Sequence, residues 1–247
     1  MLLKNKTAVI TGSNRGIGKE ILKLFSKNGA NIFACSRNFT NEFNDLVNQT
    51  QKKCNNKIIP IKINLENEND VKEASKKILS ESKDIDILIN NAASIQTSLF
   101  QMTSVKKMKE LFEINFFSQT IFIQYMIKSM IKNKSGCIVN ISSNSAIDGN
   151  EGRSAYVASK AALISQARVL SRELGPSNIR VNTIAPGLTN TEMMTKNTTK
   201  DVIEDIILRT PLKKIAEPLD IANVALFLSS NLSNHITGQT IRVDGGV

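Results

Sequence analysis

A glycine-rich turn near the amino terminus reads TGSNRGIG and spans residues 11–18. It follows the apolar run TAVI, residues 7–10, and precedes a segment whose apolar residues recur at helical spacing. Between a strand and a helix, Gly12 permits a sharp turn, Gly16 lets the backbone approach a pyrophosphate, and Gly18 permits close helix–strand packing. The free N–H groups and positive dipole end of the helix would face that phosphate. A glycine triplet alone also fits an ordinary tight turn, but in this position it predicts dinucleotide binding.

Short apolar runs alternate with longer amphipathic segments along the rest of the chain. The strands are expected at about residues 7–10, 31–35, 58–61, 85–89, 137–141, 179–184 and 240–243. The helices are expected at about residues 17–25, 41–53, 68–82, 104–131, 155–174 and 219–228. Continuously apolar strands are typical of parallel sheets covered on both faces. We therefore predict an α/β fold with a doubly wound, Rossmann-type parallel seven-stranded sheet flanked by helices. Without a linker or repeat, residues 1–247 are expected to form a single domain.

Composition narrows the class of protein. The 247 residues are 41% hydrophobic and 22% charged, which excludes a disordered tail, a collagen-like fibre and a coiled-coil rod. The 32 basic residues exceed the 22 acidic ones by ten, but 24 of them are lysines scattered along the chain. No Trp is present to stack on bases. We therefore expect no nucleic-acid partner and interpret the lysines as solvated surface.

Metal, disulfide and membrane functions find no support in the sequence. The three cysteines lie far apart and in no C-x-x-C spacing: Cys35, Cys54 and Cys137. They are expected to be reduced thiols, and the one histidine, His235, cannot support a metal cluster or a catalytic triad by itself. Lys4 and Lys6 interrupt the first residues, and no apolar run approaches the roughly 20 residues of a membrane span. The expectation is a soluble, cytoplasmic protein without a membrane partner.

The choice of dinucleotide depends on the second expected strand. NAD sites generally offer a carboxylate about 20 residues after the glycines, near the end of that strand. Residues 31–41 contain no Asp or Glu. Arg37, joined by Arg15 in the turn, could grip a 2′-phosphate with a planar charged fork. Either arginine could instead be a solvated surface charge, but the pattern favours NADP(H) over NAD(H).

Further motifs follow in a fixed order. They are NNAA at residues 90–93, Asn115, Ser143, YVASK at residues 156–160, PG at residues 186–187, Thr191 and VDGG at residues 243–246. Together with the glycine-rich turn they resemble the short-chain dehydrogenase/reductase family over essentially all 247 residues. The resemblance implies a cofactor site made by Gly12, Ser13, Arg15, Gly16, Ile17, Gly18, Arg37, Asn64, Leu65, Asn91, Ala92, Tyr156, Lys160, Pro186, Gly187, Thr189 and Thr191.

Tyr156 and Lys160 are the candidates for proton transfer. They are four residues apart on an expected helix and so share a face. A nearby lysine cation is expected to favour the tyrosinate and to lower the pKa of the phenol. Without the flanking motifs, a solvated Tyr–Lys pair would be the better interpretation.

The resemblance assigns two further residues to catalysis. The hydroxyl of Ser143 would orient the substrate carbonyl, although Ser142 and Ser145 are equally polar. Asn115 would hold a water that relays protons to Lys160, or alternatively bond helices together. Lys160 would also bond the nicotinamide ribose.

Two positions depart from the family pattern. Ala93 stands where glycine is common, and Asn64 stands where an Asp is usual beside the adenine. One methyl group could tighten the pocket, and an amide can still donate and accept hydrogen bonds. Cofactor binding is expected to survive both changes.

Within the family the chain resembles most the 3-oxoacyl-(acyl-carrier-protein) reductases. This implies reduction of a ketone or acyl thioester, acyl carrier protein as a partner, and a homotetramer or homodimer. A sugar, polyol or secondary-alcohol dehydrogenase, or a non-catalytic dinucleotide-sensing protein, are the alternatives. The polar segment of residues 188–211, called the lid segment below, carries only a short helical pattern and could cover the site or be a plain surface loop.

Overall fold

The computed structural model describes residues 1–247 and contains one seven-stranded sheet. The strands are β1 (Thr7–Thr11), β2 (Asn31–Ser36), β3 (Ile58–Lys62), β4 (Ile87–Asn90), β5 (Gly136–Ile141), β6 (Ile179–Pro186) and β7 (Thr240–Val243). Their order is β3-β2-β1-β4-β5-β6-β7, and every neighbouring pair is parallel. The predicted α/β fold with seven parallel strands is confirmed.

Helices fill the connections. They are α1 (Gly16–Lys27), α2 (Asn41–Cys54), α3 (Glu68–Glu81), α4 (Val105–Phe112), α5 (Ser118–Asn133), α6 (Ser145–Asp148), α7 (Ser154–Leu174), α8 (Glu192–Asn197), α9 (Lys200–Arg209) and α10 (Pro218–Ser229). A π-helical turn, η2 (Glu113–Phe117), joins α4 to α5. No helix combines the length and the apolar character that a membrane crossing needs.

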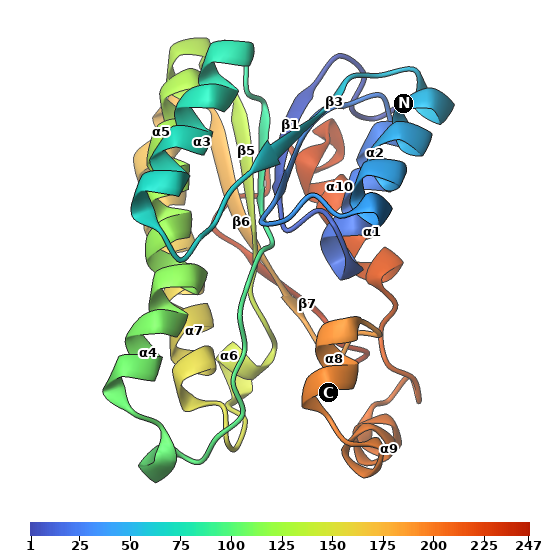
Figure 1. Ribbon diagram of the computed structural model, residues 1–247, viewed down its shortest axis with the longest axis vertical. Coiled ribbons are helices and arrows are strands. Elements are labelled where there is room, and N and C mark those ends of the chain that lie inside the picture. Colours follow the sequence, from blue (N-terminus) through green and yellow to red (C-terminus); the bar gives the residue numbers. More distant parts are fainter.

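The helices lie in two layers on either side of the sheet, with α3, α5 and α7 on one face and α1, α2 and α10 on the other (Figure 1). Successive strand residues point to opposite faces. In β1, Val9 therefore joins the core under α3, α5 and α7, while Ala8 and Ile10 join the core under α1, α2 and α10. This explains why the strands are apolar at consecutive positions rather than at alternate ones.

The order of the strands places a site at one end of the sheet. The chain leaves β1 first toward β2 on one side and later returns to β4 on the other, so the connections from β1 and β4 diverge. In open parallel sheets, ligands bind outside the carboxyl ends of the strands at such a switch point. The glycine-rich turn after β1 lies at this point.

Two expectations about helices were wrong in detail. The single helix expected at residues 104–131 is two helices, α4 and α5, joined by the π-helical turn η2. The lid segment, expected to hold one short helical pattern, contains both α8 and α9. Helical periodicity does not register one extra residue in a turn, and short polar helices carry a weak pattern.

Candidate functional site

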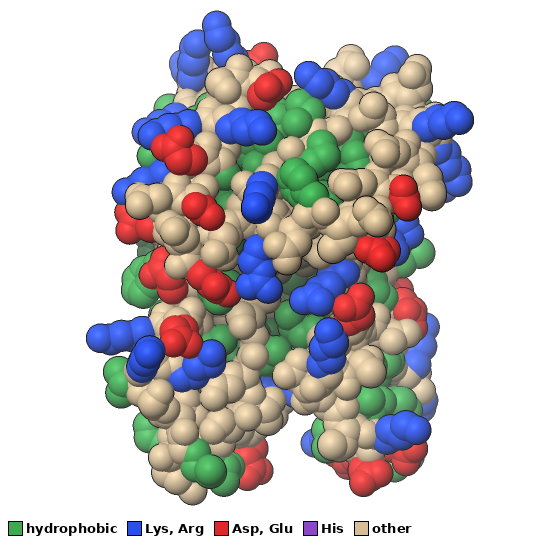
Figure 2. Space-filling model, in the orientation of Figure 1, with side chains coloured by type: hydrophobic (Ala, Val, Ile, Leu, Met, Phe, Trp, Pro, Cys, Tyr) green, Lys and Arg blue, Asp and Glu red, His purple; other side chains and the backbone are tan.

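The carboxyl ends of the central strands border one cavity of about 1390 Å³. It opens between the part of the molecule that holds α4, α6 and α7 and the part that holds α8 and α9, where Figure 2 shows a notch. Most of the predicted site residues line it: Gly12, Arg15, Gly16, Ile17, Arg37, Asn64, Leu65, Asn91, Ala92, Ser143, Tyr156, Lys160, Pro186, Gly187, Thr189 and Thr191. Ser13, Gly18 and Asn115 are not among its lining residues.

The glycine-rich turn is fastened to the end of β4 by Asn91. The side-chain amide of Asn91 donates to the carbonyl oxygens of Thr11 and Gly12, at 2.9 and 3.2 Å. In return, the hydroxyl oxygen of Thr11 accepts the backbone N–H groups of Asn91 and Ala92, at 2.9 and 3.1 Å. These four bonds hold the turn in place before any ligand binds.

Ser13 and Gly18 support the turn from beneath. The backbone N–H and the hydroxyl of Ser13 both donate to the carbonyl oxygen of Cys35, at 3.1 Å each, and the side chain is fully buried. A Cβ atom at Gly18 would lie only 2.2 Å from the carbonyl oxygen of Gly12. These two residues therefore shape the turn from outside the cavity lining, and their assignment to the cofactor site stays a prediction.

The amino end of α1 offers backbone donors. Arg15 precedes the helix in extended conformation, and no side chain caps the helix start. The first N–H groups of such a helix lack acceptors within the helix and suit an anion. Gly16 has a φ of +52°, and a Cβ atom there would lie 3.2 Å from Cγ2 of Thr191. Because position 16 has no side chain, the backbone of the turn approaches Thr191 of the lid segment closely.

Each arginine expected at a 2′-phosphate is paired with a glutamate. Arg37 contacts Glu66 at 2.9 Å, and Arg15 contacts Glu192 on α8 at 3.2 Å. All four side chains are more than half exposed. Sequence reasoning missed both glutamates, because they lie 29 and 177 residues from their partners.

Both departures from the family pattern lie at the cavity wall. The side-chain oxygen of Asn64 accepts the backbone N–H of Glu66 at 3.2 Å, so the amide shapes the loop after β3. The carbonyl oxygen of neighbouring Leu65 accepts a hydrogen bond from Ser118 at 2.7 Å. Ala93 is half-buried and lines the cavity.

Tyr156 lies near the amino end of α7 and is 8% exposed. Burial raises the pKa of its phenol, while a hydrogen bond with Ser143 and the charge of Arg153 lower that pKa without cancelling the effect of burial. Ser143 follows directly after β5 and lines the same cavity. The structure thus brings together a phenol and a hydroxyl from two separate elements.

Lys160 lies one helical turn after Tyr156 and is fully buried. Its ammonium donates to the carbonyl oxygen of Ile141 at 2.7 Å, and burial lowers its pKa to about 7. We expected Lys160 to lower the pKa of the phenol. That expectation was wrong for this conformation, because the pKa of Tyr156 is raised and the cation that opposes the rise is Arg153.

The three serines after β5 have different surroundings. The hydroxyl of Ser142 donates to the carbonyl oxygen of Lys160 at 2.9 Å, and that of Ser145 accepts a 3.5 Å contact from Asn150. Ser143 is the one of the three whose hydrogen bond lowers the pKa of the Tyr156 phenol. The geometry therefore separates three residues that the sequence left equivalent.

Asn115 lies in η2, away from the cavity, and is fully buried. Its side-chain oxygen accepts the backbone N–H of Ser94 at 2.8 Å. Its side-chain nitrogen donates to the carbonyl oxygen of Ser94 at 2.9 Å and to the hydroxyl of Ser159 at 3.0 Å. The side chain thus fastens the loop after β4 to α7, which is the alternative role that sequence reasoning left open.

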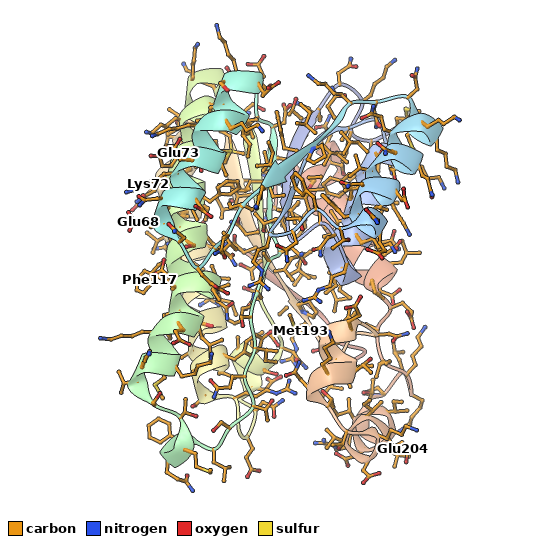
Figure 3. All side chains as sticks on the ribbon, viewed as in Figure 1. Glu68, Lys72, Glu73, Phe117, Met193 and Glu204 are labelled. Carbon is orange, nitrogen blue, oxygen red and sulfur yellow. The ribbon has the colours of Figure 1, made fainter.

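The strand end at Pro186 and Gly187 leads into the lid segment. A Cβ atom at Gly187 would lie 2.7 Å from Cβ of Asp244, so β6 and the end of β7 approach closely there. The hydroxyl of Thr191 accepts the N–H of Met194 and caps α8. From α8, Met193 lies at the cleft (Figure 3).

Sequence reasoning also missed a cluster of charged side chains, two of which line the cavity. Arg242 on β7 donates to both carboxylate oxygens of Asp148, at 2.8 and 2.6 Å, and to Asp244 at 2.6 Å. Asp148 ends α6, the helix that follows Ser143. Nothing in the local pattern links residues 94 positions apart, so only the fold shows this contact.

Known proteins resemble the chain over its whole length. A family profile described as enoyl-(acyl carrier protein) reductase matches residues 11–247. The 3-oxoacyl-[acyl-carrier-protein] reductase of Chlamydia muridarum is 38% identical over 250 residues, covering 100% of this chain and 98% of the relative. The enzyme of the same description from Thermotoga maritima is 34% identical, and the match covers 100% of this chain and 99% of that relative.

A solved structure shares the fold closely. It is a 7α-hydroxysteroid dehydrogenase complexed with NADH and 7-oxo glycochenodeoxycholic acid, with a TM-score of 0.94 and 32% identity. The match covers 99% of this chain and 94% of that one.

Proposed function

Because the chain belongs to the short-chain dehydrogenase/reductase family, and is thus an NAD(P)-dependent oxidoreductase acting on a carbonyl or hydroxyl group, we propose that it reduces a 3-oxoacyl thioester with NADPH. The observation that carries this proposal is that Ser143, Tyr156 and Lys160 line the same cavity as the glycine-rich turn. The full-length likeness to 3-oxoacyl-[acyl-carrier-protein] reductases supports the choice of substrate. The chain would work as a single domain.

The residues of the cleft fit a dinucleotide. Gly12 and Gly16 leave room for a pyrophosphate against the uncapped start of α1, where a side chain at position 12 would meet Asn91. Arg15 and Arg37 would hold a 2′-phosphate, exchanging their glutamate partners for it. Asn64, Leu65, Asn91 and Ala92 would line the nucleoside side, and Pro186, Gly187, Thr189 and Thr191 the nicotinamide side.

The bound cofactor supplies a hydride to the carbonyl carbon of the substrate. Tyr156 would give its phenolic proton to the carbonyl oxygen as charge develops there, which leaves a tyrosinate. Ser143 would donate a hydrogen bond to the same oxygen and hold it toward the phenol. Lys160, whose burial lowers its pKa to about 7, would exchange a proton near neutral pH and bond the nicotinamide ribose, as the family resemblance implies. Asn115 would hold α7 in register through Ser159, whose hydroxyl donates to the carbonyl oxygen of Tyr156.

The basic balance of the chain suits an acidic carrier. Net charge is +10, and Lys and Arg side chains are spread over the face drawn in Figure 2. Acyl carrier protein is acidic, so attraction between charges would speed the encounter. We propose acyl carrier protein as the partner that presents the thioester.

The substrate assignment is tested with purified protein and NADPH. We expect oxidation of NADPH with acetoacetyl thioesters of coenzyme A and of acyl carrier protein, and no oxidation with the crotonyl thioesters. Activity on crotonyl thioesters alone would replace the proposal with the enoyl reduction that the family profile names. For the substitutions described below, Arg168→Gln, whose side chain lies on the exposed side of α7, serves as the matched control variant.

A secondary-alcohol dehydrogenase is the second candidate, favoured by the likeness to the hydroxysteroid dehydrogenase. It predicts oxidation of a hydroxysteroid or polyol with NAD⁺ or NADP⁺ and no turnover of acetoacetyl thioesters. A non-catalytic dinucleotide sensor would bind NADPH and turn over neither. The presence of Ser143, Tyr156 and Lys160 in one cavity argues against that last function.

A further inference from the structure

Arg153 lines the same cavity as Tyr156 and is used by neither the proposed cofactor site nor the proposed proton transfer. It directly precedes α7, one helical turn before Tyr156, and its side chain is half-buried in the cavity wall. Its guanidinium donates to the carbonyl oxygen of Asn197 at 3.2 Å and to the hydroxyl of Thr198 at 3.4 Å. Both acceptors belong to the lid segment.

The contact is with the carboxyl end of α8. Asn197 is the last residue of that helix. The final carbonyl groups of a helix have no partner within it and carry the negative end of the helix dipole, so a cation is favoured there. Arg153 is therefore complementary to this end of α8 in both hydrogen bonding and charge.

Few bonds cross the cleft to the lid segment. The side-chain hydrogen bonds that reach residues 192–198 from outside the lid segment come from two arginines, and of these Arg153 alone lies on the side of α7. Arg15 holds the amino end of α8 at Glu192, on the cofactor side, and Arg153 holds the carboxyl end, on the substrate side. Figure 1 shows α8 and α9 set apart from α4 and α7, so the contact of Arg153 joins the two sides of the cavity, whereas Arg15, at the start of α1, lies on the same side as α8.

We propose that Arg153 is a positioning residue that couples closure of the lid segment to proton transfer, because the residue that fastens α8 stands one helical turn before Tyr156 in the wall of the same cavity. The inference rests on the proposed role of Tyr156 as proton donor. With the lid segment closed, the guanidinium is fixed by the carbonyl oxygen of Asn197 and the hydroxyl of Thr198. When those contacts break, it is free to move toward solvent.

The electrostatics agree with this geometry. The charge of Arg153 lowers the pKa of the Tyr156 phenol, against the rise caused by burial. The cation one helical turn after Tyr156, Lys160, donates to the carbonyl oxygen of Ile141.

The acidic groups of the cavity are engaged elsewhere or exposed. Asp148 and Asp244 are held by Arg242, and Glu192 is held by Arg15. Glu151, in the loop before Arg153, is exposed. Besides Ser143, the phenol thus has Arg153 as the group that favours its ionised form.

The chain allows a direct test without substrate. It contains no Trp and two tyrosines, Tyr125 and Tyr156. In a Tyr125→Phe background, the ultraviolet absorbance of ionised tyrosine reports Tyr156 alone. We expect Arg153→Gln to move the midpoint of that transition upward by about half a pH unit or more. Arg153→Lys, which keeps the charge, should move it less, and Arg168→Gln should leave it unchanged.

Hydrogen exchange tests the contact with the lid segment. Arg153→Gln should speed amide exchange at residues 188–211 several-fold relative to the unsubstituted chain and leave the strands unchanged. An unchanged tyrosinate midpoint would overturn the electrostatic half of the proposal. Unchanged exchange at residues 188–211 would overturn the contact, and circular dichroism over the same pH range confirms that the chain stays folded.

A kinetic arm separates this inference from the assigned function. With 3-hydroxybutyryl thioester and NADP⁺, the rate should rise with pH as the phenol ionises, and Arg153→Gln should shift that rise upward by the same amount. If the unsubstituted chain turns over no thioester, the proposed function fails while the two substrate-free measurements still decide the role of Arg153.

Discussion

Tyr156 illustrates what a residue pattern can and cannot predict. The four-residue spacing to Lys160 correctly predicted a shared helix face, because it depends only on helical geometry. The pKa of the phenol depends on burial, on Ser143 and on Arg153, and burial exceeds the other two effects. Burial is a property of the packed molecule, so no local spacing could predict the direction of the shift.

The pairing of Arg37 with Glu66 affects the choice of cofactor. A 2′-phosphate bound at Arg37, as we propose, would have to displace the Glu66 carboxylate and would be repelled by it, whereas NADH has no such group. Glu66→Gln should therefore strengthen NADPH binding about two- to fivefold, as expected for an exposed ion pair, and change NADH binding little. Cofactor fluorescence titration measures both affinities.

Two further variants frame that result. Arg37→Ala should weaken binding of NADPH far more than binding of NADH. Glu73→Gln removes one member of the exposed Glu73–Lys76 ion pair on α3, away from the cavity, and should change neither affinity. Equal changes for NADPH and NADH in Glu66→Gln would show that the 2′-phosphate does not lie here.

Burial of Lys160 makes stability depend on pH. The unfolded chain keeps the lysine proton up to its ordinary pKa of 10.5, whereas the folded chain loses it near 7. Between these values the unfolded state binds more protons, so the free energy of unfolding rises with pH. Lys160→Met should be more stable than the unsubstituted chain at pH 7, and that advantage should shrink toward pH 10. Urea denaturation across this range measures it, and a constant difference would show that the folded lysine keeps its ordinary pKa.

At the level of elements, the π-helical turn η2 interrupts a segment whose sequence pattern predicted one continuous helix. Leu111 and Phe122 fit a continuous amphipathic helix, and the π-helical turn between them leaves that pattern almost unchanged. The one indication was Asn115, a polar residue among apolar ones. Its three hydrogen bonds to Ser94 and Ser159 supply the reason for its position.

Removing those bonds should destabilise the junction of η2, the loop after β4 and α7. Asn115→Ala removes two part-buried hydrogen bonds to the backbone of Ser94 and a buried one to Ser159, and should lower the free energy of unfolding by about 1–3 kcal/mol. Chemical denaturation measures the loss, with Gln124→Ala on the exposed face of α5 as the control. A loss of the same small size in both variants would mean that solvent satisfies the freed groups.

For the whole molecule, the glycine-rich turn and the alternation of apolar runs were enough to predict the fold class. Both are local consequences of strands that are buried on two faces. The meeting of Arg242 with Asp148 and of Arg15 with Glu192 was not predictable, because each pair comes together only when distant connections pack.

Apolar side chains from α4, η2 and α7 are exposed on the surface of the molecule. Val105, Phe117 and Val169 are about half exposed or more, and Phe117 points away from the sheet in Figure 3. Because exposed apolar side chains favour association, we expect a homodimer or homotetramer in sedimentation. Phe117→Glu should dissociate it with the fold intact, and an unsubstituted chain that sediments as a monomer would contradict this expectation.

The role of Tyr156 is tested most directly by removing one oxygen atom. Tyr156→Phe keeps the ring that fills the wall of the cavity and removes the only proton that the phenol can give. NADPH should bind with unchanged affinity by fluorescence titration, while the rate of acetoacetyl thioester reduction should fall about 10²- to 10⁴-fold. Turnover within a few-fold of the unsubstituted enzyme, at the same cofactor affinity, would contradict the assignment of this phenol as the proton donor.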